Sequence, residues 1–329
     1  MKAAFYEHFG TAADVLVVGD KPIGKPAEGE VQIRMMASGV NPSDVKKRAG
    51  ARGEMTDAFV IPHSDGAGIV QALGAGVDQG WLNQRVWVCE AQHGRALGAA
   101  AEQVNLPIGM IATLPDNTSF AEGAAIPIPM MTAHRCLTSA GEIEGLTVLV
   151  TGAMGRVGHY AVQMAREMGA RVVATVGSEE DLAEVRALGV TEAVNFRDTD
   201  HFEQLLEMIG PSTVDRVVDV EFGANLLSSL PLLKDNAVIA SYASGREPMP
   251  QIDFYALMFR NIFVHPVLVY SMPAAAKVSA KASINAMLSA EKIVHRINHT
   301  LPLDDIARAH ELVEAGARGA VIVESGDAS

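Results

Sequence analysis

The fold is decided by the stretch Val148-Leu149-Val150-Thr151-Gly152-Ala153-Met154-Gly155-Arg156-Val157-Gly158, in which a short apolar run leads into three glycines. The apolar run predicts a buried β-strand, and the spacing of apolar residues over 159–168 predicts a helix after it. Gly152 permits a tight turn, Gly155 lets the backbone approach a pyrophosphate, and Gly158 lets the helix pack closely on its strand. The positive end of the helix dipole then faces the phosphates. The stretch therefore predicts a dinucleotide-binding site, and the alternative is a tight strand-to-helix turn without a ligand.

Strands and helices alternate from about residue 126 onward. The predicted strands are 148–151, 171–176, 192–195, 215–220, 237–242 and 261–269, with helices between them. This alternation is typical of an α/β fold with a doubly wound parallel sheet. Four further segments follow: a helix over 274–290, a segment over 296–300, a helix over 303–315 and a final strand over 319–324. Because the sheet is complete without them, we expect these segments to return to the first domain.

The first 120 residues have a different pattern. Short strand-like runs at 31–36, 67–73 and 85–89 are separated by Gly and Pro, which predicts a mostly β domain. We therefore predict three parts: a β domain over 1–125, a dinucleotide-binding domain over 126–271, and a C-terminal return over 272–329.

Composition excludes several classes of protein. The length of 329 residues is enough for about two domains with their own cores. A formal charge of -13 argues against nucleic acid as a partner, because phosphate contacts need clustered Lys and Arg. The chain is 49% hydrophobic, yet it has no apolar run long enough to cross a bilayer, and its first residues lack the pattern expected of a secretory leader. We expect a cytoplasmic protein with a small-molecule substrate and no membrane partner. Its two cysteines, Cys89 and Cys136, exclude a disulfide framework and a four-cysteine zinc site.

Four motifs occur in an order and spacing that together indicate a family. They are Gly39-Val40-Asn41-Pro42-Ser43-Asp44, Ile61-Pro62-His63-Ser64-Asp65-Gly66-Ala67-Gly68, Ala124-Ala125-Ile126-Pro127 followed by Thr132-Ala133, and the glycine loop. Over nearly its whole length the chain resembles the zinc-independent quinone oxidoreductases, the zeta-crystallin-like branch of the medium-chain dehydrogenase/reductase superfamily. The resemblance implies an N-terminal GroES-like β-barrel domain, a Rossmann domain and a C-terminal return, with a cofactor in the cleft between domains.

The resemblance also implies that no zinc is bound. Zinc-dependent relatives use a Cys after Gly-Val, a His-Glu pair before Gly-x-Gly, and a second Cys late in the first domain. The matching positions here hold Asn41 and Ser64-Asp65, and no second Cys is present in that region. His63 stands beside them, but a lone His is more often structural than a ligand. Without zinc there is no Lewis acid for alcohol oxidation, so reduction of a conjugated carbonyl is favoured.

The residues after the second strand of the nucleotide-binding domain bear on the choice of cofactor. NAD-specific sites carry an acid there, whereas this chain has Val176-Gly177-Ser178, which favours NADPH. Asp181 argues the other way if it lies near a 2′-phosphate, unless Arg156 or Arg197 supplies a cation. We interpret Ser178 as the N-cap of a helix whose first turn carries the acids. NADPH is expected, and NADH is the alternative.

At the reacting end of the cofactor, the resemblance places Asn41 and Thr132 beside the nicotinamide. Their alternative roles are those of turn and helix-cap residues. Lys46 matches a position where relatives carry Tyr or a proton-relay His, and an ammonium there can stabilise and protonate the reduced oxygen. The alternative is that Lys46-Lys47-Arg48 is a solvated basic face. Asp44 is expected to organise its loop through backbone hydrogen bonds.

Other cofactor contacts are expected where strands end at the carboxyl edge of the sheet. Phe196 is placed by the resemblance near the adenosine. Val220 and Phe222 are candidates for ribose or adenine contacts, with a core role as the alternative for Val220. Tyr242 either flanks the nicotinamide or packs at a strand end. The full predicted cofactor set is Asn41, Thr132, Gly152, Ala153, Gly155, Arg156, Val157, Gly158, Ser178, Phe196, Val220, Phe222 and Tyr242.

The apolar strand over 261–269 is expected at an edge of the sheet, where an unpaired strand invites pairing, so we expect a homodimer. The functional hypothesis is an NADPH-dependent, zinc-free quinone oxidoreductase that transfers hydride to a quinone or another electron-poor conjugated carbonyl. One alternative is an enoyl or acrylate C=C reductase. Another, from a different class, is a non-catalytic, crystallin-like dinucleotide-binding protein.

Overall fold

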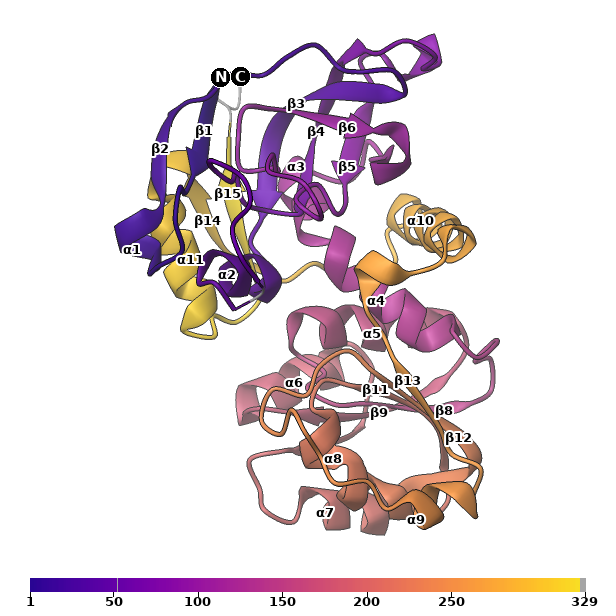
Figure 1. Cartoon of the computed structure of the whole chain (residues 1–329). Helices are drawn as coiled ribbons and strands as arrows, with labels where there is room; N and C mark the ends of the chain where they lie inside the picture. Colours follow the sequence, from indigo (N-terminus) through magenta and orange to yellow (C-terminus); the bar gives the residue numbers. More distant parts are fainter. Residues whose placement is uncertain (52, 326–329) are drawn as a thin grey trace. The chain divides into compact units, whose positions relative to one another are not determined.

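The computed structural model describes residues 1–51 and 53–325 (Figure 1). These residues form two compact units. The first contains Met1–Ile128 and the described part of Lys281–Ser329, and the second contains Pro129–Ala280. The predicted domain limits at 125/126 and 271/272 lie a little before the limits of these units. Among the described residues, no helix has the length and apolar character needed to cross a lipid bilayer.

The second unit is built on a parallel sheet. Its strands are β8 (Thr147–Val150), β9 (Arg171–Val176), β10 (Glu192–Asn195), β11 (Val214–Asp219), β12 (Leu233–Ser241) and β13 (Phe263–Pro266). They lie in the order β10-β9-β8-β11-β12-β13, and every described pair is parallel. This order defines the doubly wound Rossmann sheet and confirms the predicted fold class. The last strand is shorter than the predicted 261–269 at both ends: Asn261 adopts a positive φ of 50° before its start, and a 3₁₀ turn begins at Val269 after its end.

Helices alternate with these strands, as the sequence pattern predicts. Between the strands lie α5 (Arg156–Glu167), α6 (Glu179–Ala187), α7 (His201–Ile209), α8 (Phe222–Ser229) and α9 (Phe254–Met258), and α4 (Pro127–Thr138) precedes them. Leu149, Val173 and Val217 from neighbouring strands pack with Leu205 of α7 and Leu226 of α8 in one buried cluster. The core therefore fixes the strands whose ends carry the predicted cofactor residues.

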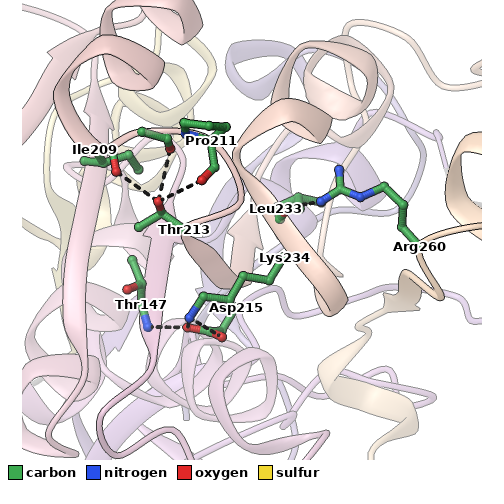
Figure 2. Close-up of polar contacts among 9 residues, drawn as sticks. Thr147, Ile209, Pro211, Thr213, Asp215, Leu233, Lys234 and Arg260 are labelled. Carbon is green, nitrogen blue, oxygen red and sulfur yellow. Dashed lines mark hydrogen bonds and ion pairs between the residues drawn. The ribbon is translucent and has the colours of Figure 1, made fainter.

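Polar side chains join the amino-terminal ends of three strands. The carboxylate of Asp215 accepts hydrogen bonds from the backbone N–H of Thr147 (2.8 Å) and from Nζ of Lys234 (2.9 Å) (Figure 2). Nearby, Oγ1 of Thr213 donates to the carbonyl of Ile209 at 2.9 Å. The guanidinium of Arg260 donates to the carbonyl of Leu233. These contacts join β8, β11 and β12 at the edge opposite their carboxyl ends.

The first unit contains a mainly antiparallel sheet. Its strands are β3 (Glu30–Gly39), β4 (Asp65–Leu73), β5 (Arg85–Val88), β6 (Gln103–Pro107), β7 (Ile111–Thr113), β14 (Ile297–Pro302) and β15 (Ala320–Glu324). The order is β14-β15-β3-β4-β5-β7, with β6 paired to β3. Strands β1 (Lys2–Phe5) and β2 (Val17–Asp20) form a separate antiparallel pair. Helices α1 (Ala12–Val15), α2 (Pro42–Arg48) and α3 (Phe120–Ala125) complete the N-terminal part.

The end of the chain returns to this first unit. Strand β15 pairs with β3, with Val323 opposite Ser38, and β14 runs parallel to β15. Helix α11 (Ile306–Glu314) lies between these two strands in sequence and packs its buried residues into the same core. The predicted C-terminal return is therefore confirmed. Helix α10 (Ala274–Ser289) crosses the limit between the two compact units along the chain.

Candidate functional site

The glycine loop joins β8 to α5 as predicted. Gly152 adopts a positive φ of 61°, and a Cβ on Gly158 would lie 2.3 Å from the carbonyl oxygen of Gly152. The fold therefore requires glycine at both positions, one for the turn and one for close helix packing. Gly155 is different: it is the exposed N-cap of α5, and an added Cβ would meet only that same carbonyl oxygen, at 3.1 Å. The open side of Gly155 and the positive end of the α5 dipole together can accept a phosphate.

Side chains from neighbouring strands hold this loop. Oγ1 of Thr151 donates to Oδ1 of Asp219 (2.7 Å) and accepts from the backbone N–H of Val220 (3.0 Å). The hydroxyl of Thr175 accepts from the N–H of Gly152 at 3.1 Å. Burial raises the pKa of the Asp219 carboxyl, and hydrogen bonds from Thr151 and Asn225 oppose that rise. Sequence reasoning missed Thr151, Thr175 and Asp219; the available signal was the polar residue at or next to the carboxyl end of each strand.

Helix α6 begins directly after β9, the strand that pairs with β8. Oγ of Ser178 accepts from the N–H of Asp181 at 3.1 Å, which confirms the predicted N-cap. Phe196 follows β10 with 40% of its surface exposed. A Cβ built on Gly177 would lie 3.0 Å from Cζ of Phe196 and 3.7 Å from Oδ2 of Asp181. An exposed ring that follows β10 and a carboxylate on α6 therefore both lie close to Gly177, which follows β9.

Val220, Phe222 and Tyr242 occupy the ends of β11 and β12. Val220 is half-buried and lies against Gly152, where an added Cβ would be 3.0 Å from its Cγ1. Phe222 packs against the sheet core. The N–H of Tyr242 donates to the carbonyl of Asp219 at 3.0 Å. Burial raises the pKa of the Tyr242 hydroxyl well above 10, and the neighbouring Cys136 and Asp219 act in the same direction. Their roles as nucleotide contacts stay predictions.

The remaining predicted residues of the second unit are also placed. Arg156 is the first residue of α5 and is half-buried, as is Val157, whereas Ala153 in the loop is buried. Thr132 is buried on α4. Arg197 is exposed, directly after Phe196. Glycine loop, Ser178, Phe196, Val220 and Tyr242 thus follow the carboxyl ends of adjacent strands, which is where parallel sheets bind ligands.

A second polar group lies in the first unit, where α2 begins. The backbone N–H of Asn41 donates to Oδ2 of Asp44 at 2.7 Å, so Asp44 organises this turn through a backbone hydrogen bond as predicted. Nδ2 of Asn41 donates to Oδ2 of Asp65, also at 2.7 Å. The same Asp65 oxygen accepts from the N–H of Ile128 at 3.0 Å. All three polar side chains are buried, and burial raises the pKa of Asp65 well above its usual range.

The basic run on α2 is not a uniform solvated face, so that alternative is wrong for part of it. Lys46 is exposed. Lys47 is half-buried, and its Nζ donates to the carbonyl of Gln92 at 3.3 Å; burial lowers the pKa of this ammonium. Arg48 is buried and donates to the carbonyl of Gly10 and to the carboxylate of Glu314. Only Lys46 remains directed to solvent, which leaves its predicted proton-donor role open.

His63 is structural, but it is not alone. Its Nδ1 lies 2.8 Å from Oγ of Ser38, and its Nε2 lies 3.1 Å from Nε2 of His310 on α11. The two imidazoles stack with centroids 5.2 Å apart, and both are fully buried. Burial lowers the pKa of His63 to about 3 and that of His310 well below 6.5. Both rings are therefore neutral at pH 7, and one N–H must be shared between the two facing nitrogens.

A GroES-like first unit and a Rossmann second unit with an open glycine loop define a dinucleotide-dependent oxidoreductase. Residues 27–116 match the alcohol dehydrogenase GroES-like domain family, and residues 157–283 match the zinc-binding dehydrogenase family. Together with its relatives, these matches show that the chain belongs to the quinone oxidoreductase branch of the medium-chain dehydrogenase/reductase superfamily.

Several named relatives extend over almost the whole chain. The chain is 30% identical to a quinone oxidoreductase of Sus scrofa over 96% of its own length and 95% of the relative. It is 27% identical to a quinone oxidoreductase of Pongo abelii, over 98% and 97% of the two lengths. It is also 27% identical to a 2-haloacrylate reductase of a Burkholderia species, over 91% of each. These relatives indicate an oxidoreductase.

Solved structures have the same fold. An NAD-dependent alcohol dehydrogenase, 28% identical, superposes with a TM-score of 0.86 over 99% of this chain and 100% of that one. A mycobacterial protein complexed with NADPH, 26% identical, gives a TM-score of 0.85 over 98% and 100%. Relatives of this fold therefore bind nicotinamide dinucleotides.

Proposed function

We propose that this protein is an NADPH-dependent quinone oxidoreductase that transfers hydride to a quinone or a similar conjugated carbonyl without zinc. The proposal rests chiefly on one observation. The loop that would hold the dinucleotide is open at Gly155, while the positions that match zinc ligands of related dehydrogenases carry Asn41 and Ser64. The amide of Asn41 instead donates a hydrogen bond to Asp65. The relatives named quinone oxidoreductase support the substrate class.

The residues in this part of the first unit do not fit zinc. Nδ2 of the Asn41 amide donates to Asp65, and the same Asp65 oxygen also accepts from the N–H of Ile128, so both side chains already have protein partners. Cys89 is buried, and its thiol donates to the carbonyl of Met110 at 3.4 Å. Across residues 1–51 and 53–325, no three His, Cys, Asp or Glu side chains are grouped as metal ligands. Tetrahedral zinc needs such a set.

The proposed chemistry uses short polar groups. Bound NADPH supplies the hydride. Asn41 and Thr132 keep the nicotinamide-contact roles that the resemblance assigns to them, because an amide and a hydroxyl can hydrogen-bond a carboxamide or a substrate oxygen. The exposed ammonium of Lys46 is a proton source for the oxygen that becomes negative when hydride adds to carbon.

The direct test is oxidation of NADPH and NADH against a panel of small quinones, enones and acrylates. We expect turnover with quinones that is faster with NADPH and is unchanged after dialysis against EDTA. Elemental analysis of the same sample should find less than one zinc per chain. One bound zinc per chain together with activity lost to the chelator would contradict the proposed mechanism.

A second candidate is reduction of an activated C=C bond. The similarity to a 2-haloacrylate reductase favours it, since hydride can add to the C=C bond of an enone or acrylate while the oxygen needs only hydrogen bonds. Faster turnover of acrylates than of quinones in the panel would select this function. Nucleotide binding without any turnover would select the non-catalytic, crystallin-like alternative.

The preference for NADPH over NADH rests on Ser178, which stands near where NAD-specific relatives carry an acid, and on the NADPH complex of a related protein. The carboxylate of Asp181 lies close to Gly177, and its negative charge there opposes the preference for NADPH. We expect Asp181→Lys to tighten NADPH relative to NADH. A fully formed contact with the 2′-phosphate contributes about 1.5–3 kcal/mol, which exceeds a tenfold change in the affinity ratio, and a screened one about 1 kcal/mol or less. Titration of nucleotide fluorescence measures the ratio.

The same substitution places a cation at the positive end of the α6 dipole, so thermal stability must be measured with binding. Arg197→Ala is the matched comparison, because Arg197 is exposed at the neighbouring strand end. An unchanged affinity ratio in Asp181→Lys would show that Asp181 does not face the phosphate.

We also propose that two copies of the chain join through β13. This strand is at one end of the sheet order, and it pairs only with β12 among the described strands. Exposed apolar rings lie on β13, on the preceding α9 and directly after that helix: Phe263 is 55% exposed, Phe254 64% and Phe259 78%. Apolar rings beside an unpaired strand edge favour a second copy over solvent.

Sedimentation equilibrium tests the assembly. We expect a dimer for the native chain and a larger monomer fraction for Phe263→Lys, because a charge at an edge strand opposes pairing. A native chain that sediments as a monomer at all concentrations would rule the dimer out.

A further inference from the structure

The Asp65 carboxylate connects two segments that are distant in sequence. It is the first residue of β4 and is fully buried. One of its oxygens receives both the Nδ2 of Asn41 at 2.7 Å and the backbone N–H of Ile128 at 3.0 Å. Ile128 lies in the first turn of α4, where helix N–H groups have no partner within the helix. Asp65 therefore fixes a side-chain amide and the start of a helix with one side chain.

This contact restricts Asn41 in a way that a helix cap alone would not. The terminal torsion of an Asn side chain is broad and roughly two-fold, so an unpartnered amide can turn about it. A buried acceptor oxygen that takes the hydrogen bond of Nδ2 removes this freedom, because the reversed amide would place its own oxygen against another acceptor and lose the hydrogen bond. Asp44 holds the backbone of the same residue through its own hydrogen bond. Both the main chain and the amide plane of Asn41 are thus fixed by carboxylates.

We infer that Asp65 is a positioning residue that sets the orientation of the Asn41 amide toward the nicotinamide carboxamide. The inference rests on the proposed function, in which Asn41 contacts the nicotinamide. In this role Asp65 touches neither cofactor nor substrate. It acts only through Asn41. The orientation of the Asn41 amide depends on the acceptor oxygen of Asp65 and not on the net charge of its side chain.

The experiment compares Asp65→Leu, Asp65→Asn, Asn41→Ala and the double variant Asn41→Ala/Asp65→Leu. Asp65→Leu removes the acceptor. Asp65→Asn keeps an oxygen that can accept from Asn41 and loses only the charge. Asp215→Asn is the matched control, because Asp215 also accepts from a backbone N–H but lies at the opposite end of its own sheet from the glycine loop. Each variant is measured for kcat and KM with a quinone, for NADPH affinity, for the fluorescence of bound NADPH, and for thermal unfolding.

We expect Asp65→Leu to lower kcat by about ten- to a hundredfold with less than about threefold change in NADPH affinity, because misplacement affects the reacting geometry more than the phosphate contacts. Asp65→Asn should recover most of this loss. In the Asn41→Ala background, Asp65→Leu should change kcat by less than about twofold, since the residue it positions is gone. The fluorescence of bound NADPH should change in Asp65→Leu and not in Asp215→Asn.

If the native chain reduces the quinone, two results would overturn the inference. One is an equal loss of kcat from Asp65→Leu in the native and Asn41→Ala backgrounds. The other is an Asp65→Asn variant as impaired as Asp65→Leu, which would assign the effect to charge. If Asp65→Leu does not fold, the comparison of Asp65→Asn with the native chain still decides: a loss above about tenfold in kcat contradicts the inference. A native chain that binds NADPH but reduces no quinone, enone or acrylate contradicts the proposed function instead, and the nucleotide fluorescence then tests the inference separately.

Discussion

Replacement of Gly155 by Val is expected to abolish detectable NADPH binding while the protein remains folded. The fold accepts a Cβ at this position with a small shift, because the backbone at Gly155 has an ordinary extended conformation (φ -72°, ψ 170°) and the added Cβ meets one carbonyl oxygen, at 3.1 Å. The branched side chain would instead occupy the space through which a pyrophosphate approaches the start of α5. We expect stability to change by about 1 kcal/mol or less, as for a substitution at a helix N-cap. Isothermal titration with NADPH and urea unfolding measure the two effects.

Gly158→Ala is the control with the opposite expected behaviour. Its Cβ would lie 2.3 Å from the carbonyl oxygen of Gly152, and that backbone atom cannot move without opening the turn. Overpacking of this kind costs about 1–3 kcal/mol. Gly155→Val should therefore lose binding and keep stability, whereas Gly158→Ala should lose stability first. If Gly155→Val retains native NADPH affinity, the loop is only a turn between β8 and α5.

Acid should destabilise the first unit through its buried histidine pair. Burial lowers the pKa of His63 to about 3 in the folded protein, whereas an unfolded His has a pKa near 6.5. The unfolded chain then takes up protons first as the pH falls. The stability contributed by the neutral pair is complete above about pH 6.5 and is lost progressively between about 6.5 and 3, at about 1.4 kcal/mol per pH unit for each group. Urea unfolding at several pH values between 7 and 4 measures the slope.

A variant separates this effect from other titrating groups. Asp65 and Asp219 have raised pKa values because of burial, so their protonation in acid acts in the opposite direction. His134, buried on α4 with a pKa lowered to about 4, acts in the same direction as the pair. His310→Phe keeps a ring against His63 and removes one titrating group. It should be less stable at pH 7, because Nε2 of His63 loses its partner, yet show a shallower loss of stability in acid. Parallel slopes for the two proteins would contradict the assignment to the pair.

Features that depend on neighbours in sequence could be predicted well. The glycine loop, the strands over 171–176 and 192–195, and the N-cap at Ser178 all follow from interactions within a few residues, namely period, turn chemistry and capping. The conformations required at Gly152 and Gly158 are also local, because the turn brings them together across only six positions. The predicted start of the last strand was wrong, because Asn261 adopts a turn conformation although it stands next to an apolar run.

Contacts between distant segments could not be predicted. His63 looked like a lone histidine because its partner, His310, is 247 residues further along the chain. Arg48 looked like part of a solvated basic run, but α11 brings Glu314 against it. The Asn41–Asp65 hydrogen bond joins the start of a helix to the start of a strand. The residue types and their local spacing by themselves predict the Rossmann sheet and its phosphate-binding loop, because short-range geometry specifies both. The pairing of buried polar groups was decided only when the tertiary fold removed them from water, since a buried donor or acceptor must find whichever partner packing brings within reach.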